Sequence, residues 1–205
     1  MESLLVWLYG ISPVIQIVSL VTGIVFMVMQ SLQYKWMWYF GLVTSGTALV
    51  VSLVNMNEGP VWAPLWAQVA MNAYFFVMDI VGIFSWRRIG KGSDSTVHIV
   101  ALSRRRMAFY GLMALIAAPL VCFLLSFTND PEPVADGVSF TLSIVAQIML
   151  TRSYLEQWYL WMAADVIAIL VFASQGAWWM VALYVCYIVN SVFGVYYWRR
   201  HGKYV

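Results

Sequence analysis

The chain has 205 residues, of which 63% are hydrophobic and only 10% are charged, with a formal net charge of +2. Soluble domains carry about 25% charged residues, so this composition excludes a soluble globular protein and indicates a polytopic membrane protein. The apolar stretches are continuous rather than alternating with polar residues, which excludes a transmembrane β-barrel.

Seven apolar stretches are candidates for membrane-spanning helices, which need ~20 mainly apolar residues each. In chain order they cover residues 13–29, 36–54, 64–86, 107–127, 138–150, 154–174 and 177–198, and the fifth is the shortest. The segment "MESLLVWLYG" before the first stretch lacks the basic residues that open a signal peptide. We therefore expect a short interfacial or external segment there and no cleavable leader.

The charged residues predict the orientation. If all seven stretches cross the membrane, alternate connections lie on the same side, and all 11 Lys and Arg residues then fall on one side. The positive-inside rule makes this side cytoplasmic, so we expect the N-terminus outside and the C-terminus inside. The basic charge thus indicates membrane orientation and no nucleic-acid binding.

The polar segment 87–106, "RRIGKGSDSTVHIVALSRRR", is rich in Gly, Ser and Asp and predicts a flexible cytoplasmic loop. Its "GKGSDS" stretch follows no predicted strand and lacks the full phosphate-loop pattern, which argues against phosphate binding. Cys122 and Cys186 fall inside predicted spans. We expect both to be packed thiols that form neither a disulfide nor a metal site.

The chain also repeats itself. "MDIVGIFSWRR" at 78–88 matches "NSVFGVYYWRR" at 190–200, with Gly82 aligned to Gly194 and Trp86 to Trp198. More weakly, "MWYFGLVT" in the second helix aligns with "LWMAADVI" in the sixth. We predict an all-α integral membrane protein with seven transmembrane helices in a 3+1+3 parallel repeat. Residues 1–86 form the first three-helix repeat, 87–127 the cytoplasmic loop and linker helix, and 128–205 the second repeat.

Two acids, Asp79 and Asp165, lie within the predicted spans. A charged side chain at the bilayer centre costs ~3 kcal/mol or more, so such residues usually face a cavity or a partner. No Lys or Arg lies deep in a span, which leaves protonation, hydrogen bonds to polar neighbours, or a cation that comes and goes. Asp165 lies roughly 16 Å from the cytoplasmic start of its helix, close to the midplane.

Helical spacing places aromatic and polar side chains beside both acids. Trp158, Trp161 and Asp165 share one face of the sixth helix. The other groups are Gln68, Asn72 and Asp79 on the third helix, Tyr187, Asn190 and Gly194 on the seventh, Ser143 and Gln147 on the fifth, and Thr44 and Ser45 on the second. An aromatic face beside a buried anion suits a flat cation, since stacking and cation–π attraction contribute about 1–2 kcal/mol each when desolvated.

Tryptophans near the ends of spans have a different expected role. Trp36, Trp38, Trp62 and Trp66 fit an interfacial aromatic belt.

Several classes of membrane protein need residues that the spans lack. A retinal protein needs a lysine in a span for its Schiff base, and an intramembrane metalloenzyme or nucleophile pair needs His or Lys there. His98 and His201 both lie in cytoplasmic segments. Two acids on separate helices do not establish a proton relay. We therefore expect a transporter of a small solute, with no enzyme activity and no cofactor. A non-transporting receptor or assembly protein is the alternative from a different functional class.

Residues 143–198 carry a resemblance. They read "SIVAQIMLTRSYLEQWYLWMAADVIAILVFASQG" and then "YIVNSVFGVYYW", while "WYFGLV" and "DIVGIFSW" in the first half match more loosely. This stretch resembles the PnuC family of bacterial vitamin transporters. The family motif Trp-x-x-Trp-x-x-x-Asn falls on Trp158, Trp161 and position 165.

The resemblance implies a SWEET-like 3+1+3 fold in the bacterial inner membrane and facilitated diffusion of a vitamin precursor, usually nicotinamide riboside. It also implies trapping by a cytoplasmic kinase and assembly into homotrimers. Trp158, Trp161 and Asp165 would then bind the ring and charge of the substrate. The implied hydrogen-bonding residues are Thr44, Gln68, Asn72, Asp79, Gln147, Tyr187 and Asn190.

The sequence departs from the family pattern at three positions. Asp165 stands where the motif has asparagine, and we would also expect asparagine at the positions of Asp79 and Thr44. Nicotinamide riboside and thiamine are both flat cations, so an added carboxylate suits either. Nicotinamide riboside is the first expectation and thiamine is the second.

Overall fold

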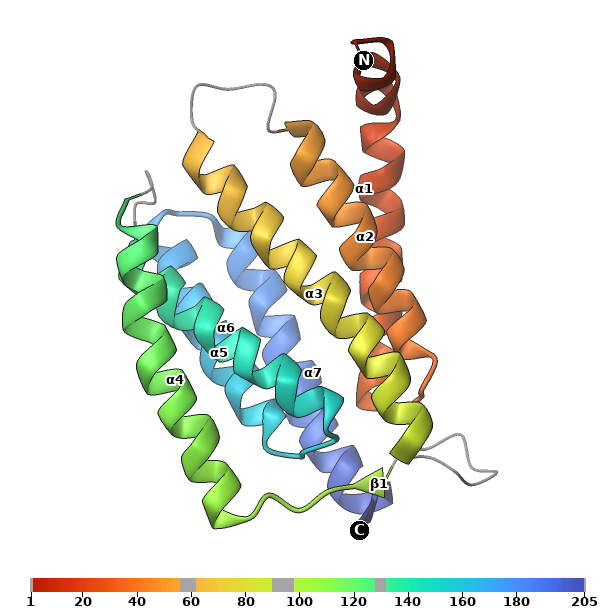
Figure 1. Ribbon diagram of the computed structural model, residues 1–205, viewed down its shortest axis with the longest axis vertical. Coiled ribbons are helices and arrows are strands. Elements are labelled where there is room, and N and C mark those ends of the chain that lie inside the picture. The colour runs from red at the N-terminus through yellow and green to blue at the C-terminus, as the bar shows by residue number, and fades with distance from the viewer. Residues whose placement is uncertain (1, 56–61, 90–97, 128–131, 205) are drawn as a thin grey trace.

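The computed structural model describes residues 2–55, 62–89, 98–127 and 132–204, with side chains described for 14–53, 69–87, 99–127 and 132–203 (Figure 1). This part of the chain forms helices joined by short turns and one very small parallel sheet. The elements are α1 (Glu2–Ser31), α2 (Met37–Asn55), α3 (Trp62–Ile89), β1 (His98–Ile99), α4 (Arg104–Leu125), α5 (Pro133–Thr151), α6 (Gln157–Ser174), α7 (Trp178–His201) and β2 (Lys203–Tyr204).

Six of these helices are long and apolar enough to cross a membrane, and α2 contributes the shorter apolar stretch Met37–Leu53. The helices alternate in direction along the chain (Figure 1). The described Lys and Arg side chains therefore gather at the end where α1, α3, α5 and α7 finish, which we call the basic end. The prediction of a helical, multi-pass membrane protein is confirmed.

Two helices begin earlier than the predicted spans. The helix α1 begins at Glu2, so residues 2–12, expected to precede the first helix, are helical as well, while the apolar span within it, Val14–Ser31, matches the predicted one. Residues 3–9 contain neither proline nor glycine, and a proline such as Pro13 is tolerated inside membrane helices. The helix α5 is longer than expected and begins at Pro133, because proline's fixed φ suits the first turn of a helix.

The predicted flexible loop 87–106 is wrong at both ends, because α3 continues to Ile89 and residues 98–106 form β1, a short connection and the start of α4. Strand β1 pairs in parallel with β2, placing His98 beside Lys203. The next residue, Ile99, is fully buried in the main hydrophobic core, and the backbone N–H of Val100 donates to the carbonyl of Ser153 at 3.1 Å. The "GKGSDS" stretch lies outside the described residues.

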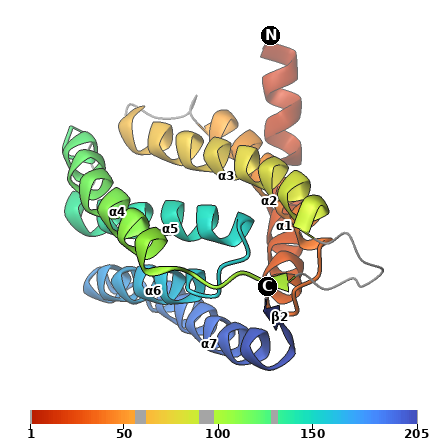
Figure 2. The same cartoon turned by 60° about the horizontal axis from the view of Figure 1, so that its bottom comes forward.

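The helices form two groups of three. α1 packs on α2 and α2 on α3, while α5 packs on α6 and α6 on α7. Viewed from the basic end, α4 lies outside both groups, against α5 (Figure 2). None of the residues of α4 is fully buried, so this helix presents most of its surface to the surroundings.

The turns after α1 and after α5 have the same geometry. Gln33 and Ser153 both adopt positive φ, at 61° and 58°. In each turn the next tyrosine donates its backbone N–H back to the preceding helix: Tyr34 to Met29 at 2.9 Å, and Tyr154 to Met149 at 3.1 Å. The two turns thus place the following helices, α2 and α6, in matching orientations.

Each group also packs one tryptophan against one glycine. A Cβ atom at Gly82 would overlap the ring of Trp38, and one at Gly194 would overlap the ring of Trp158. Both rings are fully buried. Trp38 is therefore not part of an interfacial belt, which corrects that prediction. Trp36 is 63% exposed, and the side chains of Trp62 and Trp66 lie outside the described residues.

The two contacts also correct the predicted alignment of the second and sixth helices. The structural counterpart of Trp38 is Trp158, so the predicted alignment of "MWYFGLVT" with "LWMAADVI" was three residues out of register.

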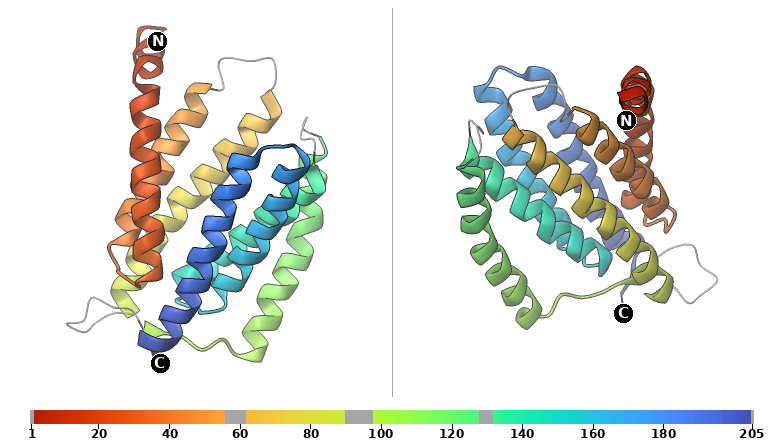
Figure 3. Two further views of the ribbon diagram at one scale, coloured as in Figure 1. Left: turned by 180° about the vertical axis from the view of Figure 1, so that it is seen from behind. Right: turned by 45° about the horizontal axis from the view of Figure 1, so that its top comes forward.

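The ends of α1 and α7 lie near each other at the basic end (Figure 3), where a reciprocal pair of hydrogen bonds joins the two groups. The indole N–H of Trp86 in α3 donates to the carbonyl of Leu150 in α5 at 3.1 Å. The indole N–H of Trp198 in α7 donates to the carbonyl of Gln30 in α1 at 3.0 Å. These acceptors are among the last carbonyls of their helices, which have no partner within the helix.

Replacing either contact glycine should destabilise the fold. Gly82→Ala and Gly194→Ala should each lower the free energy of unfolding by about 1–3 kcal/mol, because the added methyl group meets a rigid ring and overpacks the core. Thermal unfolding of the purified protein in detergent measures this loss. Gly111→Ala is the matched control, since no atom lies within 4 Å of its Cβ position. Equal melting temperatures for all three variants would contradict the packing argument.

Candidate functional site

A cavity of about 380 Å³ lies between the two helix groups. Ligand pockets in proteins typically enclose roughly 300–1,000 Å³, so the space suits a small organic molecule. The described lining residues come from every helix except α4: Gly23, Phe26, Met27, Gln30, Gly41, Thr44, Ser45, Ala48, Met71, Asn72, Phe75, Asp79, Ser139, Ser143, Gln147, Trp158, Trp161, Ala164, Asp165, Tyr184, Tyr187, Asn190 and Ser191.

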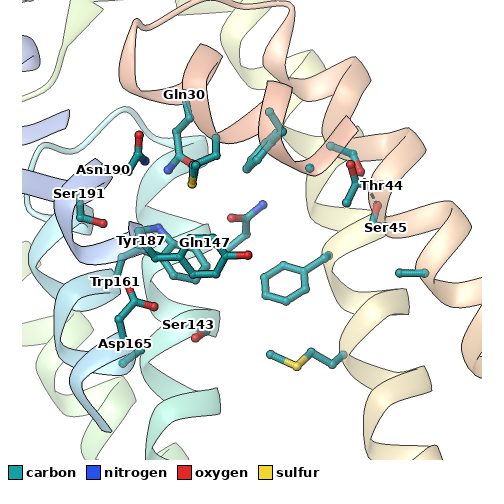
Figure 4. A pocket seen from close by; sticks show the side chains of 18 of the residues that line it. Gln30, Thr44, Ser45, Ser143, Gln147, Trp161, Asp165, Tyr187, Asn190 and Ser191 are labelled. Carbon is teal, nitrogen blue, oxygen red and sulfur yellow. Dashed lines mark hydrogen bonds between the residues drawn. The ribbon is translucent and has the colours of Figure 1, made fainter. Parts of the chain in front are cut away.

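The structure brings nearly all of the predicted site residues together in this cavity. The residues that line it as expected are Thr44, Asn72, Asp79, Gln147, Trp158, Trp161, Asp165, Tyr187 and Asn190. The side chain of Gln68 lies outside the described residues. Polar groups spread along the cavity, with Gln30 and Asn190 toward one end and Ser143 and Asp165 toward the other (Figure 4).

Asp79 is held by hydrogen bonds from two neighbouring helices. One carboxylate oxygen accepts from the hydroxyl of Ser45 at 2.8 Å, and the other accepts from the amide of Gln147 at 3.5 Å. Only 2% of Asp79 is exposed, and a Cβ atom at Gly41 would touch its carboxylate. Asp79 therefore links α2, α3 and α5 across the two groups, and much of its bonding capacity is already used.

Asp165 has a different environment. It lines the same cavity and is 6% exposed, yet no described side chain donates a hydrogen bond to it. A buried carboxylate without a donor or counter-ion is unfavourable in a low-dielectric interior. The carboxylate therefore matches a ligand that carries a positive charge or hydrogen-bond donors.

Aromatic rings wall the cavity next to Asp165. Trp161 stacks on Phe75 with a centroid separation of 6.5 Å and an interplanar angle of 29°. The ring of Tyr187 reaches into the cavity beside Trp161 (Figure 4), and it packs edge-on against Tyr184. Rings from α3, α6 and α7 thus offer flat faces close to a carboxylate, an arrangement that suits an aromatic cation.

Four tryptophans form a buried cluster at the basic end, and one of them, Trp158, lines the cavity. Trp38, Trp86, Trp158 and Trp198 are each less than 2% exposed, and their rings meet mainly edge to face, as in Trp158–Trp198 at 5.7 Å and 88°. We call this set the tryptophan floor. Trp158 therefore contributes to the floor as well as to the cavity wall, whereas Trp161 belongs to the wall alone.

Sequence reasoning missed several lining residues. Gln30 sits in the last turn of α1, where its carbonyl also accepts from Trp198. Ser191 and Tyr184 line the cavity from α7. Their signal was faint, since one polar residue in an apolar helix does not reveal which face it occupies.

Comparisons with known proteins agree with this geometry. A family model described as nicotinamide mononucleotide transporter matches residues 13–200. The chain belongs to this family. Its relatives carry the name nicotinamide riboside transporter PnuC, so the expected PnuC membership is confirmed, and the chain is a multi-pass inner-membrane protein of a transporter family.

The similarity to individual PnuC proteins extends over most of the chain. The Haemophilus influenzae protein is 25% identical over 97% of this chain and 85% of its own length. The Escherichia coli protein is 25% identical over 92% of this chain and 86% of its own. The crystal structure of the vitamin B3 transporter PnuC superposes with a TM-score of 0.68 at 25% identity, covering 96% of this chain and 88% of that one.

Removing the hydroxyl that bonds to Asp79 should destabilise the transporter. Ser45→Ala leaves a buried carboxylate oxygen without its 2.8 Å donor, which should lower the free energy of unfolding by about 1–3 kcal/mol. Thermal unfolding in detergent is the measurement. Thr47→Ala is the control, because the exposed hydroxyl of Thr47 bonds only to backbone carbonyls of its own helix. A loss no larger than that of the control would show that Asp79 does not depend on Ser45.

Proposed function

We propose that the transporter takes up a flat cationic vitamin precursor, with nicotinamide riboside as the first candidate, by facilitated diffusion. The carboxylate of Asp165, which lies in an aromatic-walled cavity with no donor among the described side chains, carries this proposal. The name nicotinamide riboside transporter on the Haemophilus influenzae and Escherichia coli relatives supports the pyridinium nucleoside as the substrate.

The substrate's parts match different regions of the cavity. The pyridinium ring would stack on Trp161 and Tyr187, with Asp165 neutralising its charge. The indole N–H of Trp161 is buried without an acceptor among the described residues, so an oxygen of the ligand would satisfy it. Hydrogen bonds to the sugar and amide would come from the remaining proposed site residues, Thr44, Gln68, Asn72, Asp79, Gln147, Tyr187 and Asn190, while Trp158 supports the ring from the floor.

Net uptake would come from phosphorylation of the substrate in the cytoplasm. Neither an ATP-site pattern nor an ion-coupling motif is evident in the sequence, so the chain would only equilibrate the substrate across the membrane. A cytoplasmic kinase would then trap it, because a phosphate adds negative charge that the membrane and an anionic cavity both disfavour. We also propose that the protein assembles into homotrimers, for which the family resemblance is the support.

The basic end would face the cytoplasm, with the N-terminus outside. The gathering of the described Lys and Arg side chains at that end supports this orientation. Arg87 and Arg199 donate to the phenols of Tyr39 and Tyr159 at the same level, an arrangement typical of a membrane interface. The tryptophan floor would then separate the cavity from the cytoplasm.

We also propose that the two helix groups form the SWEET-like 3+1+3 parallel repeat, with α4 as the linker. The identical turns at Gln33 and Ser153 and the two Trp–Gly contacts support this division. So does the reciprocal bonding of Trp86 and Trp198 across the groups. The proposed boundaries are 1–86 for the first repeat, 87–127 for the loop and linker helix, and 128–205 for the second repeat.

Thiamine is the second candidate substrate. The observation that favours it is the set of departures from the family pattern, Asp165, Asp79 and Thr44, of which Asp165 faces the cavity without a donor. The alternative from another functional class is a receptor or assembly protein that does not transport the vitamin. Uptake of labelled vitamin into liposomes that contain only the purified protein separates them, because a receptor would bind without giving uptake.

Asp165→Asn should weaken binding of nicotinamide riboside by about tenfold, since it removes the charge but keeps a similar shape. Quenching of tryptophan fluorescence in the purified protein measures the affinity. The reduced, dihydropyridine form of the riboside is the matched ligand control, because it has the same outline and no ring charge. Its affinity should change far less. Equal losses for both forms would mean that Asp165 does not recognise charge, and Thr47→Ala should change neither.

The same variant tests which vitamin the carboxylate selects. If Asp165 is a specialisation for thiamine, Asp165→Asn should weaken thiamine binding more than riboside binding. Equal effects on the two vitamins would contradict that specialisation. Failure of the unmodified protein to bind either one would overturn the assignment of a cationic vitamin altogether.

A further inference from the structure

A second hollow lies on the outer surface of the second helix group, away from the cavity. This groove of about 500 Å³ runs between α6 and α7 at the basic end. Tyr159, Met162, Val192, Val195, Tyr196, Arg199 and Arg200 line it. The part of the groove toward the middle of the helices is apolar, and Val192 there is 54% exposed. Two arginines lie at the basic end of the groove.

The two arginines are fixed in place but keep their charge. The guanidinium of Arg199 donates to the phenol of Tyr159 at 2.7 Å, which ties α7 to α6. That of Arg200 donates to the phenol of Tyr196 at 2.6 Å and lies 5.3 Å from the centroid of its ring. Phenols are neutral acceptors, and no described carboxylate lies within 4 Å of either guanidinium. Each guanidinium has five N–H donors, so most remain available to another group.

The groove has the dimensions of a lipid contact. Val192 lies seven residues before Arg199 on α7, roughly 10 Å deeper along the helix axis. An apolar channel of that depth beneath a pair of fixed cations matches a phospholipid whose acyl chain enters the groove and whose phosphate lies between the guanidinium groups. Arginine binds phosphate with two parallel hydrogen bonds where the geometry allows.

The first helix group offers a natural contrast. Arg87 donates to Tyr39 as Arg199 does to Tyr159. However, the residue three positions before Arg87 is Phe84, whereas the residue three positions before Arg199 is Tyr196. Phenylalanine has no hydroxyl, so a second arginine could not be held there as Arg200 is. Among the described side chains the paired cation site therefore lies in the α6–α7 groove, and the side chain of Arg88 is outside them.

We propose that the groove between α6 and α7 is a binding site for an anionic phospholipid, with Arg199 and Arg200 as the phosphate and charge contacts. Charge complementarity selects an anionic lipid over a zwitterionic one, since the headgroup's negative charge is not cancelled by a cation of its own. The site is separate from the vitamin cavity, so this proposal holds whichever vitamin is transported.

The test is native mass spectrometry of the purified full-length protein, titrated with phosphatidylglycerol and with phosphatidylcholine of the same chains. The unmodified protein should retain phosphatidylglycerol in preference. The double variant Arg199→Gln/Arg200→Gln should lose about thirtyfold in affinity for it, at about fivefold per arginine near a membrane surface. Arg87→Gln removes one charge from the same end of the bundle and should leave the lipid bound.

A second variant tests the apolar part of the site and does not alter charge. Val192→Trp fills the groove and should reduce retention of phosphatidylglycerol, whether or not the arginine variant folds. The proposal is overturned if the unmodified protein shows no preference, or if Arg87→Gln weakens binding as much as the double variant. It is also overturned if Val192→Trp leaves lipid binding intact but dissociates an oligomer, because the groove would then be an interface between copies. Vitamin binding, followed by fluorescence, should be unchanged in the double variant, which separates this outcome from failure of the proposed transport function.

Discussion

The packing of a tryptophan ring onto a bare glycine backbone is the contact on which the rest of this structure depends. Trp38 covers Gly82 and Trp158 covers Gly194, and a single added methyl group would collide with either ring. Because apolar helices have no hydrophobic reason to associate within lipid, close packing of this kind is a main source of their association. Each contact fixes the angle at which the second helix of a group crosses the third. It also brings the indoles of Trp86 and Trp198 to the point where they bond to the opposite group.

That framework places equivalent positions of the two groups around one cavity, and the sequence fills them differently. Counted from the positive-φ residues Gln33 and Ser153, Ser45 and Asp165 occupy the same position. Counted from the contact glycines, Asp79 and Ser191 do. Each group therefore carries one acid and one serine. In the first group the serine is on the second helix and the acid on the third, and in the second group the order is reversed. In the first group the serine donates to the acid at 2.8 Å. In the second group no described donor reaches the acid, which leaves its carboxylate for a ligand.

Much of this could be read from the sequence, and the reasons are physical. The lengths of the apolar stretches defined the helices, and the segregation of Lys and Arg predicted which helix ends lie on the same side of the membrane. Glycines and tryptophans in register revealed matched helices, and helical spacing collected most of the cavity residues, since residues on one face of a helix move together. What stayed hidden depends on contacts between distant segments. The roles of Asp79 and Asp165 differ because of Ser45 and Gln147, and no spacing within one helix could reveal that. The burial of Ile99 likewise depends on the C-terminal strand and on the tryptophan floor.

The tryptophan floor is tightly packed, yet its polar atoms are incompletely satisfied. The indole N–H groups of Trp38 and Trp158 have no acceptor in the described part of the chain, and the same holds for the side-chain amide of Gln157 as a donor. A buried donor without a partner costs about 1–3 kcal/mol, and water reaching the floor would satisfy all three. The floor is therefore held by edge-to-face ring packing and by the two indole bonds that join the groups. No ion pair among the residues described contributes to it.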